Sequence, residues 1–433
     1  MTTPTTPSPK TRGSSAPTVD TAKAAPVLLD RRDERLEDQS GIGGAVRGFA
    51  QRVRNGDIGA LPVIVGLVVI WTIFQILNPV FLSSNNLVNL LFDSCSVGVI
   101  ALGIVCVLMV GEIDLSVGSV SGLSAAIMGV LWVNHGWPFF LGIAAAIAAG
   151  VVIGAVYSAL FNRFGMPSFI ASLAGLLAFL GLQLYLLGSA GSINLPYGSA
   201  VVNFGQLYFV PPVVAYILAA VVAAAFYATA QLRIRERRQR GLSTKNSAVV
   251  VVQSVAILVV LEAVVFYLNR DRGVPWMFVV FAGLVLALNY GLTRTQWGRS
   301  MQAVGGNREA ARRAGINVRR IYLTAFVLCS ALAAIGGILA AARLASSSQS
   351  SGTGDVNLNA IASAVIGGTS LFGGRGSAYS ALLGIIVIQS ISNGLTLLNL
   401  DSSLRFMITG AVLAVAVMVD SLARRSRASH GAG

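Results

Sequence analysis

Hydrophobic residues make up 55% of the 433-residue chain and charged residues only 11%. Soluble domains carry about 25% charged residues, so this composition excludes an ordinary soluble protein and predicts a membrane protein. The formal net charge of +14 would suggest nucleic-acid binding in a soluble protein. Here the basic residues lie in the tails and between apolar runs, and no nucleic-acid-binding motif occurs. The three cysteines lie within apolar runs, which favours buried side chains over a disulfide or a metal site.

Two polar tails flank the hydrophobic body. Residues 1–55 are rich in Thr, Ser, Pro and Ala, and we expect a disordered cytoplasmic tail because such a segment cannot bury a core. They are not a signal peptide, since no apolar stretch follows the first basic residues. Residues 424–433 are predicted to form a basic cytoplasmic tail. Residues 56–423 between them are predicted to form one membrane domain.

The body of the chain divides into apolar segments. A helix needs about 20 apolar residues to cross a bilayer, and the sequence therefore predicts an all-α transmembrane bundle of about 10–12 spans. The twelve candidate segments are 61–77, 87–110, 115–133, 138–161, 168–188, 211–231, 248–268, 274–293, 321–343, 357–372, 378–398 and 403–420. The segment 357–372 is short and ends in glycine, which favours a re-entrant segment over a full crossing.

The connecting loops alternate in charge. One set contains the run RIRERRQR at 233–240, the long loop 294–320 and the basic C-terminal tail. The other set has only Arg270 and Arg272 as basic residues. Because basic loops stay in the cytoplasm, this asymmetry predicts that both termini are cytoplasmic.

Catalytic signatures are poorly represented. The chain has two histidines, no aspartate-rich magnesium motif and no GxxxxGK[ST] phosphate loop. The glycine-rich stretch 367–377 lacks the lysine of a phosphate cradle, so its glycines are expected to permit a tight turn or a close helix approach. An intramembrane enzyme is therefore disfavoured, and we expect no catalytic residues, cofactor or metal.

Ionisable residues within spans are few. An ion-coupled secondary transporter of a small polar solute would need such residues to bind protons or sodium, and the main candidates are Asp93 and Glu262. Glu262 is readily explained as a structural carboxylate at a helix interface. This alternative stays open, but the scarcity of intramembrane charge favours another energy source.

Two polar segments stand out from this background. The first is GEIDLSVGS at 111–119, where Glu112 and Asp114 precede a helix; Asp114 is expected either to cap that helix or to contact a substrate. The second is 293–320, which has seven arginines and one acid, Glu309. It is either a solvated basic loop or, where Glu309-Ala310-Ala311 precedes a helix-ending Gly315, a short amphipathic helix on the cytoplasmic face.

With the block AIASAVIGGTSLFGGRGSAYSALLG at 360–384, these motifs make residues 60–423 resemble the membrane permease subunits of ATP-binding-cassette sugar importers. The resemblance is to the ribose/xylose/galactose permease family, and most closely to its xylose branch. In that family the second segment is a coupling helix that binds the ATPase subunit, here about 307–317. The resemblance assigns this role to Asn307, Glu309, Ala310, Ala311 and Gly315.

The resemblance also implies a mechanism and partners. Two identical permease chains would line one pathway in the bacterial cell membrane, a separate ATPase subunit would hydrolyse ATP, and an extracytoplasmic binding protein would deliver a sugar, D-xylose or a related pentose. An inverted repeat is expected, although 95–133 and 326–352 are only weakly similar. Substrate-pathway candidates, each also explicable as a structural polar residue, are Asn89, Asp93, Glu112, Asp114, Gln183, Gln389 and Asn393.

Overall fold

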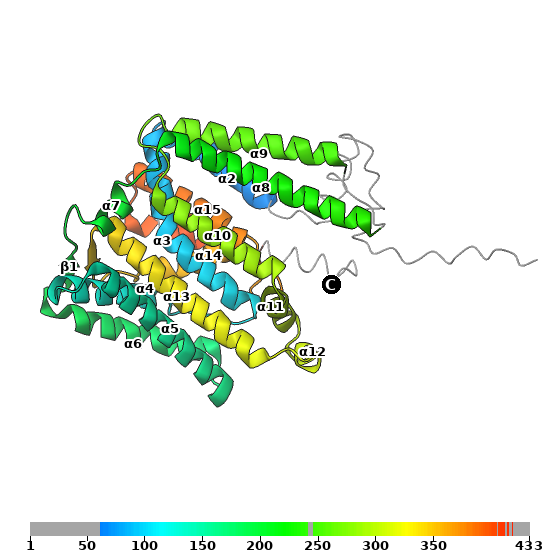
Figure 1. The fold of residues 1–433 in the computed structure, drawn as a ribbon. Helices are drawn as coiled ribbons and strands as arrows, with labels where there is room; N and C mark the ends of the chain where they lie inside the picture. The colour runs from blue at the N-terminus through cyan, green and yellow to red at the C-terminus, as the bar shows by residue number, and fades with distance from the viewer. Residues whose placement is uncertain (1–60, 241–245, 405, 412–413, 415–417, 419–433) are drawn as a thin grey trace, which may run out of the picture.

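Helices make up nearly all of the regular structure in the computed structural model, which describes residues 61–240, 246–404, 406–411, 414 and 418. The predicted tails 1–55 and 424–433 lie outside these residues, as does part of the predicted span 403–420. Figure 1 shows the helices lying side by side as a bundle, with loops gathered at two opposite ends.

Within the described part of the chain, nine helices are long and apolar enough to cross a membrane. Each coincides with a predicted span. They are α3 (Ser84–Met109), α4 with its π-helical extension (Val117–Asn134), α5 (Phe139–Phe164), α6 with a short 3-10 turn (Ser168–Ala190), α8 (Pro212–Gln239), α9 (Ser247–Leu268), α10 (Trp276–Arg294), α13 (Val318–Leu344) and α15 (Ala378–Leu397).

Two apolar helices are shorter. Helix α2 (Leu61–Leu77) occupies the first predicted span with 17 residues. Helix α14 (Val356–Ile366) has only 11 residues, and at 1.5 Å per residue it extends about 16 Å, roughly half of the ~30 Å hydrocarbon core. Helix α14 alone is therefore too short to cross, but non-helical residues on both sides extend the segment. Ala345 before it contacts Leu195, whereas Gly374 after it contacts Met109 at the opposite end of the bundle, so the structure does not support a re-entrant 357–372.

Local sequence signals explain where the long helices begin and end. A proline directly precedes α5, α6, α8 and α10, and proline fits there because the first backbone N–H groups of a helix have no partner within it. Helix α5 ends at Gly165, whose φ of 67° is left-handed and therefore suits glycine.

Three predicted loops contain more structure than expected. The loop 294–320 is largely helical: α11 (Gln296–Gly306) was not predicted, and α12 (Arg308–Arg313) follows it. Its polar composition concealed α11, which buries only Gly298, Met301 and Val304. The loops 189–210 and 344–356 contain β1 (Ser192–Asn194) and β2 (Ser346–Ser348), which pair antiparallel, and the short helix α7 (Ala200–Gln206).

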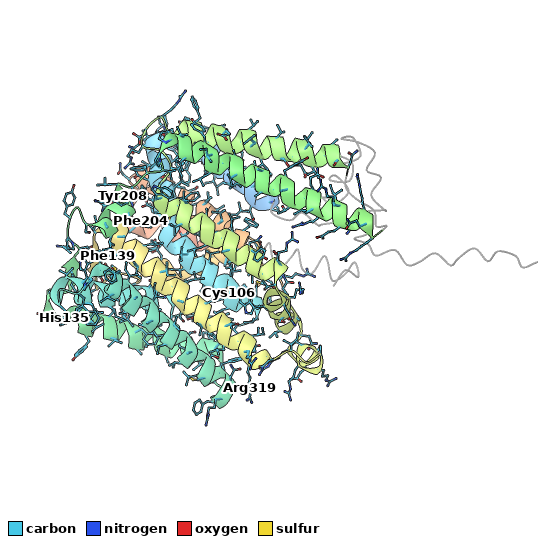
Figure 2. All side chains as sticks on the ribbon, in the orientation of Figure 1. Cys106, His135, Phe139, Phe204, Tyr208 and Arg319 are labelled. Carbon is cyan, nitrogen blue, oxygen red and sulfur yellow. The ribbon has the colours of Figure 1, made fainter. Side chains whose placement is uncertain are left out.

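The two loop sets lie at opposite ends of the bundle. At the sheet end, named for β1 and β2, the Asn78 side-chain amide donates to the Leu397 carbonyl at 3.0 Å. At the opposite end, named the α12 end, the Asn162 side-chain amide donates to the Arg319 carbonyl at 3.2 Å. Figure 2 shows His135 and Tyr208 toward the first end and Arg319 at the second. The loops therefore alternate as the predicted topology requires.

Helix α13 is the centre of the core. It packs along α3, α4 and α5, and Figure 1 shows it in yellow between them. The large side chains of Phe92, Phe281 and Phe326 are fully buried in this core. Helices α8 and α9 instead pack mainly on each other at the edge of the bundle and expose many apolar side chains, as lipid-facing helices do.

Candidate functional site

Three predicted pathway residues, Asp93, Gln389 and Asn393, meet between α3 and α15 near the sheet end, and a fourth, Asn89, lies beside them on α3. The Gln389 side-chain amide donates to the backbone carbonyl of Asp93 at 3.1 Å. Asn393 and Asn86 exchange two side-chain hydrogen bonds, at 2.7 and 3.0 Å. Asn89 lies one turn before Asp93 on the same helix. The spacing within α3 and α15 thus turns these amide and carboxylate groups toward one another.

Asp93 is paired with a residue that sequence analysis missed. Arg343, at the end of α13, donates from Nε to Asp93 Oδ1 at 2.9 Å. Asn89 Oδ1 accepts from Arg343 Nη2 at 3.3 Å and from Arg272 Nη2 at 2.9 Å. A carboxylate in a span needs a partner, and this rule predicts a basic residue near Asp93. It does not identify Arg343, because 250 residues separate the pair in the sequence.

Aromatic rings support both guanidinium groups. The Arg343 guanidinium lies 4.8 Å from the centre of the Phe92 ring, and that of Arg272 lies 5.7 Å from the Phe209 ring. The two rings meet edge to face at 5.7 Å. Such contacts attract a cation to the ring face and hold each guanidinium in place.

A small cavity opens beside this cluster. Its volume is about 120 Å³, and it is lined by Leu90, Asp93, Gln389, Ser392, Asn393 and Thr396. Amide, hydroxyl and carboxylate groups supply both donors and acceptors. The cavity can therefore hydrogen-bond a neutral polyhydroxylated molecule, and the Asp93 charge is already balanced by Arg343.

A second polar region lies where α4 and α14 meet. Both are short helices that follow a non-helical segment, and the backbone N–H of Gly118, in the first turn of α4, donates to Asn357 Oδ1 in the first turn of α14. Gln183 of α6 is fully buried, and its amide donates to the carbonyls of Ser348 and Ser351 at 2.9 and 3.0 Å. Gln183 thus links α6 to the segment between β2 and α14, and it lies away from the α3–α15 cluster.

The carboxylates of the 111–119 motif lie toward the α12 end. Asp114 is 1% exposed, and its Oδ1 accepts from the backbone N–H and the hydroxyl of Ser116 at 2.8 and 2.7 Å. Ser116 is the N-cap residue of α4, so Asp114 orders the turn before the helix and does not itself cap α4 as one of the two predictions proposed. Tyr157, which sequence analysis did not select, donates to Ser116 Oγ at 2.6 Å.

Glu112 is half-buried at the same connection. It accepts a hydrogen bond from the Ser168 hydroxyl at 2.6 Å. Burial raises the pKa of its carboxyl above the usual 4.5, and the Ser168 hydrogen bond and the Arg308 charge partly offset this rise. Glu112 and Asp114 therefore hold the α3–α4 connection, and neither reaches the cavity between α3 and α15.

Helix α12 contains the predicted coupling residues. Asn307 caps it, since its Oδ1 accepts from the Ala310 N–H at 2.9 Å, and Gly315 has a left-handed φ of 83° just beyond its end. Ala311 is buried, whereas Glu309 and Ala310 are exposed. The predicted short amphipathic helix is therefore present, with Ala311 packed on the bundle and a mostly charged face exposed at the surface.

Over residues 61–240, 246–404 and the few beyond them that the structure describes, no group of three His, Cys, Asp or Glu side chains is placed to hold a metal ion. The three cysteines are buried and unpaired by disulfides.

Residues 86–417 match the family model described as branched-chain amino acid transport system / permease component. The chain belongs to this permease family. It is thus a multi-pass protein of the bacterial cell membrane and a non-catalytic subunit of an ATP-binding-cassette importer, which confirms the resemblance found in the sequence. Membership implies an ATPase subunit and a binding protein as partners.

The relatives of this permease include sugar permeases. It is 37% identical to the xylose transport system permease protein XylH of Escherichia coli K12 over 346 residues, which cover 80% of this chain and 87% of the relative. It is 33% identical to XylH of Haemophilus influenzae, over 86% of this chain and 98% of the relative. It is 30% identical to the ribose import permease protein RbsC of Escherichia coli K12, over 83% and 92%. No solved structure gives a significant match.

Proposed function

We propose that this permease forms the translocation pathway for a monosaccharide, D-xylose or a related pentose. Two of the relatives compared above are named as xylose permeases. A sugar is neutral and rich in hydroxyl groups, so a pathway for it needs hydrogen-bonding groups without net charge. The α3–α15 cluster has this character because Arg343 neutralises Asp93.

The main support for this proposal is that the cluster is polar, lies on membrane-spanning helices and is only partly buried. The side chains of Asp93 and Arg343 are 39% and 24% exposed. Ionisable groups are costly to expose to lipid and normally face a water-filled path or another protein surface. The face formed by α3 and α15 is therefore proposed to line the pathway, with Asn89, Asp93, Gln389 and Asn393 near the sugar.

A second copy of the chain is proposed to complete this pathway. The cavity of about 120 Å³ is smaller than the ~300 Å³ of a typical ligand pocket. Two such half-sites, related by a two-fold axis as in most homo-oligomers, would enclose a sugar between identical faces. Lipid would then contact the outward helices such as α8 and α9.

The α12 end is proposed to face the cytoplasm, with both termini on that side. The run 233–240 and the α11–α12 region contribute most of the arginines between spans, whereas the loops of the sheet end contain Arg270 and Arg272; basic loops are retained in the cytoplasm. The exposed face of α12, around Glu309 and Ala310, would then bind the ATPase subunit. The sheet end would receive the sugar from the extracytoplasmic binding protein.

An inverted repeat is proposed from the order of elements. Helix α3 ends at the α12 end and is followed by a non-helical segment and the short α4. Helix α13 ends at the sheet end and is followed by a non-helical segment and the short α14. Short helices that begin within the membrane and meet at their N-termini are typical of transporters with inverted repeats.

Uptake in proteoliposomes tests the proposed function. We expect ATP-dependent uptake of labelled D-xylose only when permease, ATPase and binding protein are all present, and competition by related pentoses. Replacing Gln389 with Leu should reduce uptake while ATPase co-purification persists. Uptake by the permease alone, driven by a proton or sodium gradient, would instead establish a secondary transporter. Equal uptake of all sugars supplied with their binding proteins would remove the pentose assignment.

A further inference from the structure

The three motifs that carry the family resemblance meet at the α12 end. The backbone N–H of Gly374, in the 367–377 stretch, donates to the carbonyl of Met109 at the end of α3 at 2.9 Å. Gly305, in the last turn of α11, lies so close that a Cβ there would overlap the Met109 carbonyl oxygen and lie 2.5 Å from the Gly374 nitrogen. The backbones themselves are therefore in contact.

Gly373 closes the same contact from another side. A Cβ on Gly373 would lie 2.7 Å from the Gly305 carbonyl oxygen and 2.9 Å from the Gly111 nitrogen, and its φ of 82° is left-handed. We name Gly111, Gly305, Gly373 and Gly374 the glycine junction. The tight packing expected of the 367–377 glycines is confirmed, and its partners are α11 and the α3–α4 connection.

Each branch of the glycine junction leads to a different functional element. Gly305 lies three residues before α12, the proposed coupling helix. Gly111 begins the connection to α4, and Gly373 and Gly374 lie in the loop that leaves α14. The first turns of α4 and α14 are hydrogen-bonded to each other through Gly118 and Asn357. One backbone contact thus joins α12 to both short helices.

Arg308, the first residue of α12, makes a second connection in the same place. Its guanidinium lies 5.6 Å from the centre of the Phe161 ring of α5 and 5.4 Å from that of Tyr322 of α13. Its charge also acts on the Glu112 carboxyl, which is held by Ser168 of α6. Arg308 therefore ties α12 to the helices that surround the α3–α4 connection.

We propose that the glycine junction transmits displacement of α12 to α4 and α14, with Gly305 and Arg308 as its positioning residues. This inference rests on the proposed function, in which the ATPase moves α12. Packed backbones have no flexible side chain between them to absorb a displacement, and close-packed elements shift between discrete arrangements rather than deforming continuously. A shift of α11 and α12 would accordingly move the start of α4 and the end of α14 together.

Adjacent glycines provide a matched test. Gly305→Ala places a methyl group into the Met109 and Gly374 backbones, whereas a Cβ at Gly306 meets nothing within 4 Å. In proteoliposomes with the ATPase and binding protein, we expect Gly305→Ala to bind the ATPase and hydrolyse ATP but to transport about two- to thirty-fold less sugar per ATP, the range of known coupling mutations. Gly306→Ala should match the wild type in all three measurements.

Arg308→Gln extends the test if Gly305→Ala does not assemble in the membrane. It should lower sugar transported per ATP while ATPase co-purification remains as in the wild type. The proposal is overturned if Gly305→Ala transports as much sugar per ATP as the wild type. If that variant does not assemble, the same result with Arg308→Gln overturns it. Loss of ATPase binding in Arg308→Gln also overturns it, because Arg308 would then be a docking contact. If the wild-type permease neither binds the ATPase nor transports sugar, the proposed function itself fails.

Discussion

Single polar side chains in this permease are held by partners far away in the chain. Asp93 could have been a proton or sodium site, but its ion pair with Arg343 at 2.9 Å gives it a fixed counter-charge. Partly exposed ion pairs contribute only about 0–1 kcal/mol to stability. The pair is therefore better explained by the electrostatics of a transport face than by a need for stability.

Glu112 supports a prediction on pH dependence. Because burial raises the pKa of Glu112 above 4.5, the folded protein binds a proton at this carboxyl more tightly than the unfolded chain does. The stabilisation from the protonated form is fully present below the unfolded pKa and is lost as pH rises through the folded pKa. Glu112→Gln mimics the protonated form, so the melting temperature of the wild type should fall relative to that of the variant as pH rises from about 4 toward neutral.

Thermal unfolding of both proteins in lipid nanodiscs, measured by intrinsic fluorescence at matched pH values, gives this difference directly. Other titrating groups are the same in the two proteins and cancel. A difference that stays constant over the whole pH range would contradict the burial of Glu112 in the folded permease.

Among the elements, the short helices have the proposed functional roles, and the long helices position them. The nine long helices form the framework, whereas α12 and α14 are too short to cross a membrane and lie where motion or binding is proposed. Helix α12 buries Ala311 and leaves its remaining residues exposed. A six-residue helix is marginal by itself, so the Asn307 cap and packing on the bundle must stabilise it.

Glu309→Lys tests α12 as the docking element. The substitution reverses a charge on the exposed face and breaks only a surface pair with Arg312 at 3.8 Å, so the protein should still insert and fold. We expect the ATPase to be lost from the purified complex, because the reversed charge lies on the exposed face of α12 that is proposed to contact it, and charge reversal disrupts electrostatic complementarity at an interface. Glu236→Lys, an exposed acid-to-base change near the same end on α8, is the control and should retain the ATPase. Normal co-purification and uptake with Glu309→Lys would show that α12 is not the docking surface.

Over the whole molecule, two faces have different characters. The sheet end is built from β1, β2 and loops with few basic residues, and the α12 end from arginine-rich helices and the glycine junction. Between them, the polar α3–α15 face and the apolar α8–α9 pair give the bundle one side suited to a pathway and another suited to lipid.

Cysteine labelling tests the orientation of the whole molecule. The three native cysteines are buried, so a membrane-impermeant maleimide should react only with introduced ones. Tyr197→Cys, at a sheet-end position that is 89% exposed, should be labelled in intact cells. Arg313→Cys, exposed on α12, should be labelled only after the membrane is opened. The reverse pattern would place the α12 end outside the cell.

Much of the architecture could be predicted from local sequence. Long apolar runs predicted all nine long helices, and Gly315 marked the end of α12, whose start near Asn307 followed from the family resemblance. Helix α11 was missed because its apolar face is narrow and its composition is polar. The site was predicted only in part: Asn89, Asp93, Gln389 and Asn393 were selected for being polar within spans, while their meeting point and the partner Arg343 were not foreseen.

The sequence by itself determined that this protein is a membrane permease, where most of its helices run and which short segment resembles a coupling helix. These properties follow from hydrophobicity and helix-ending residues, which act over one or two turns. Only the tertiary structure decided that Arg343 pairs with Asp93 and that Gly305, Gly373 and Gly111 touch. Such contacts join segments far apart in the chain, so they depend on how whole helices pack, and no local pattern specifies that packing.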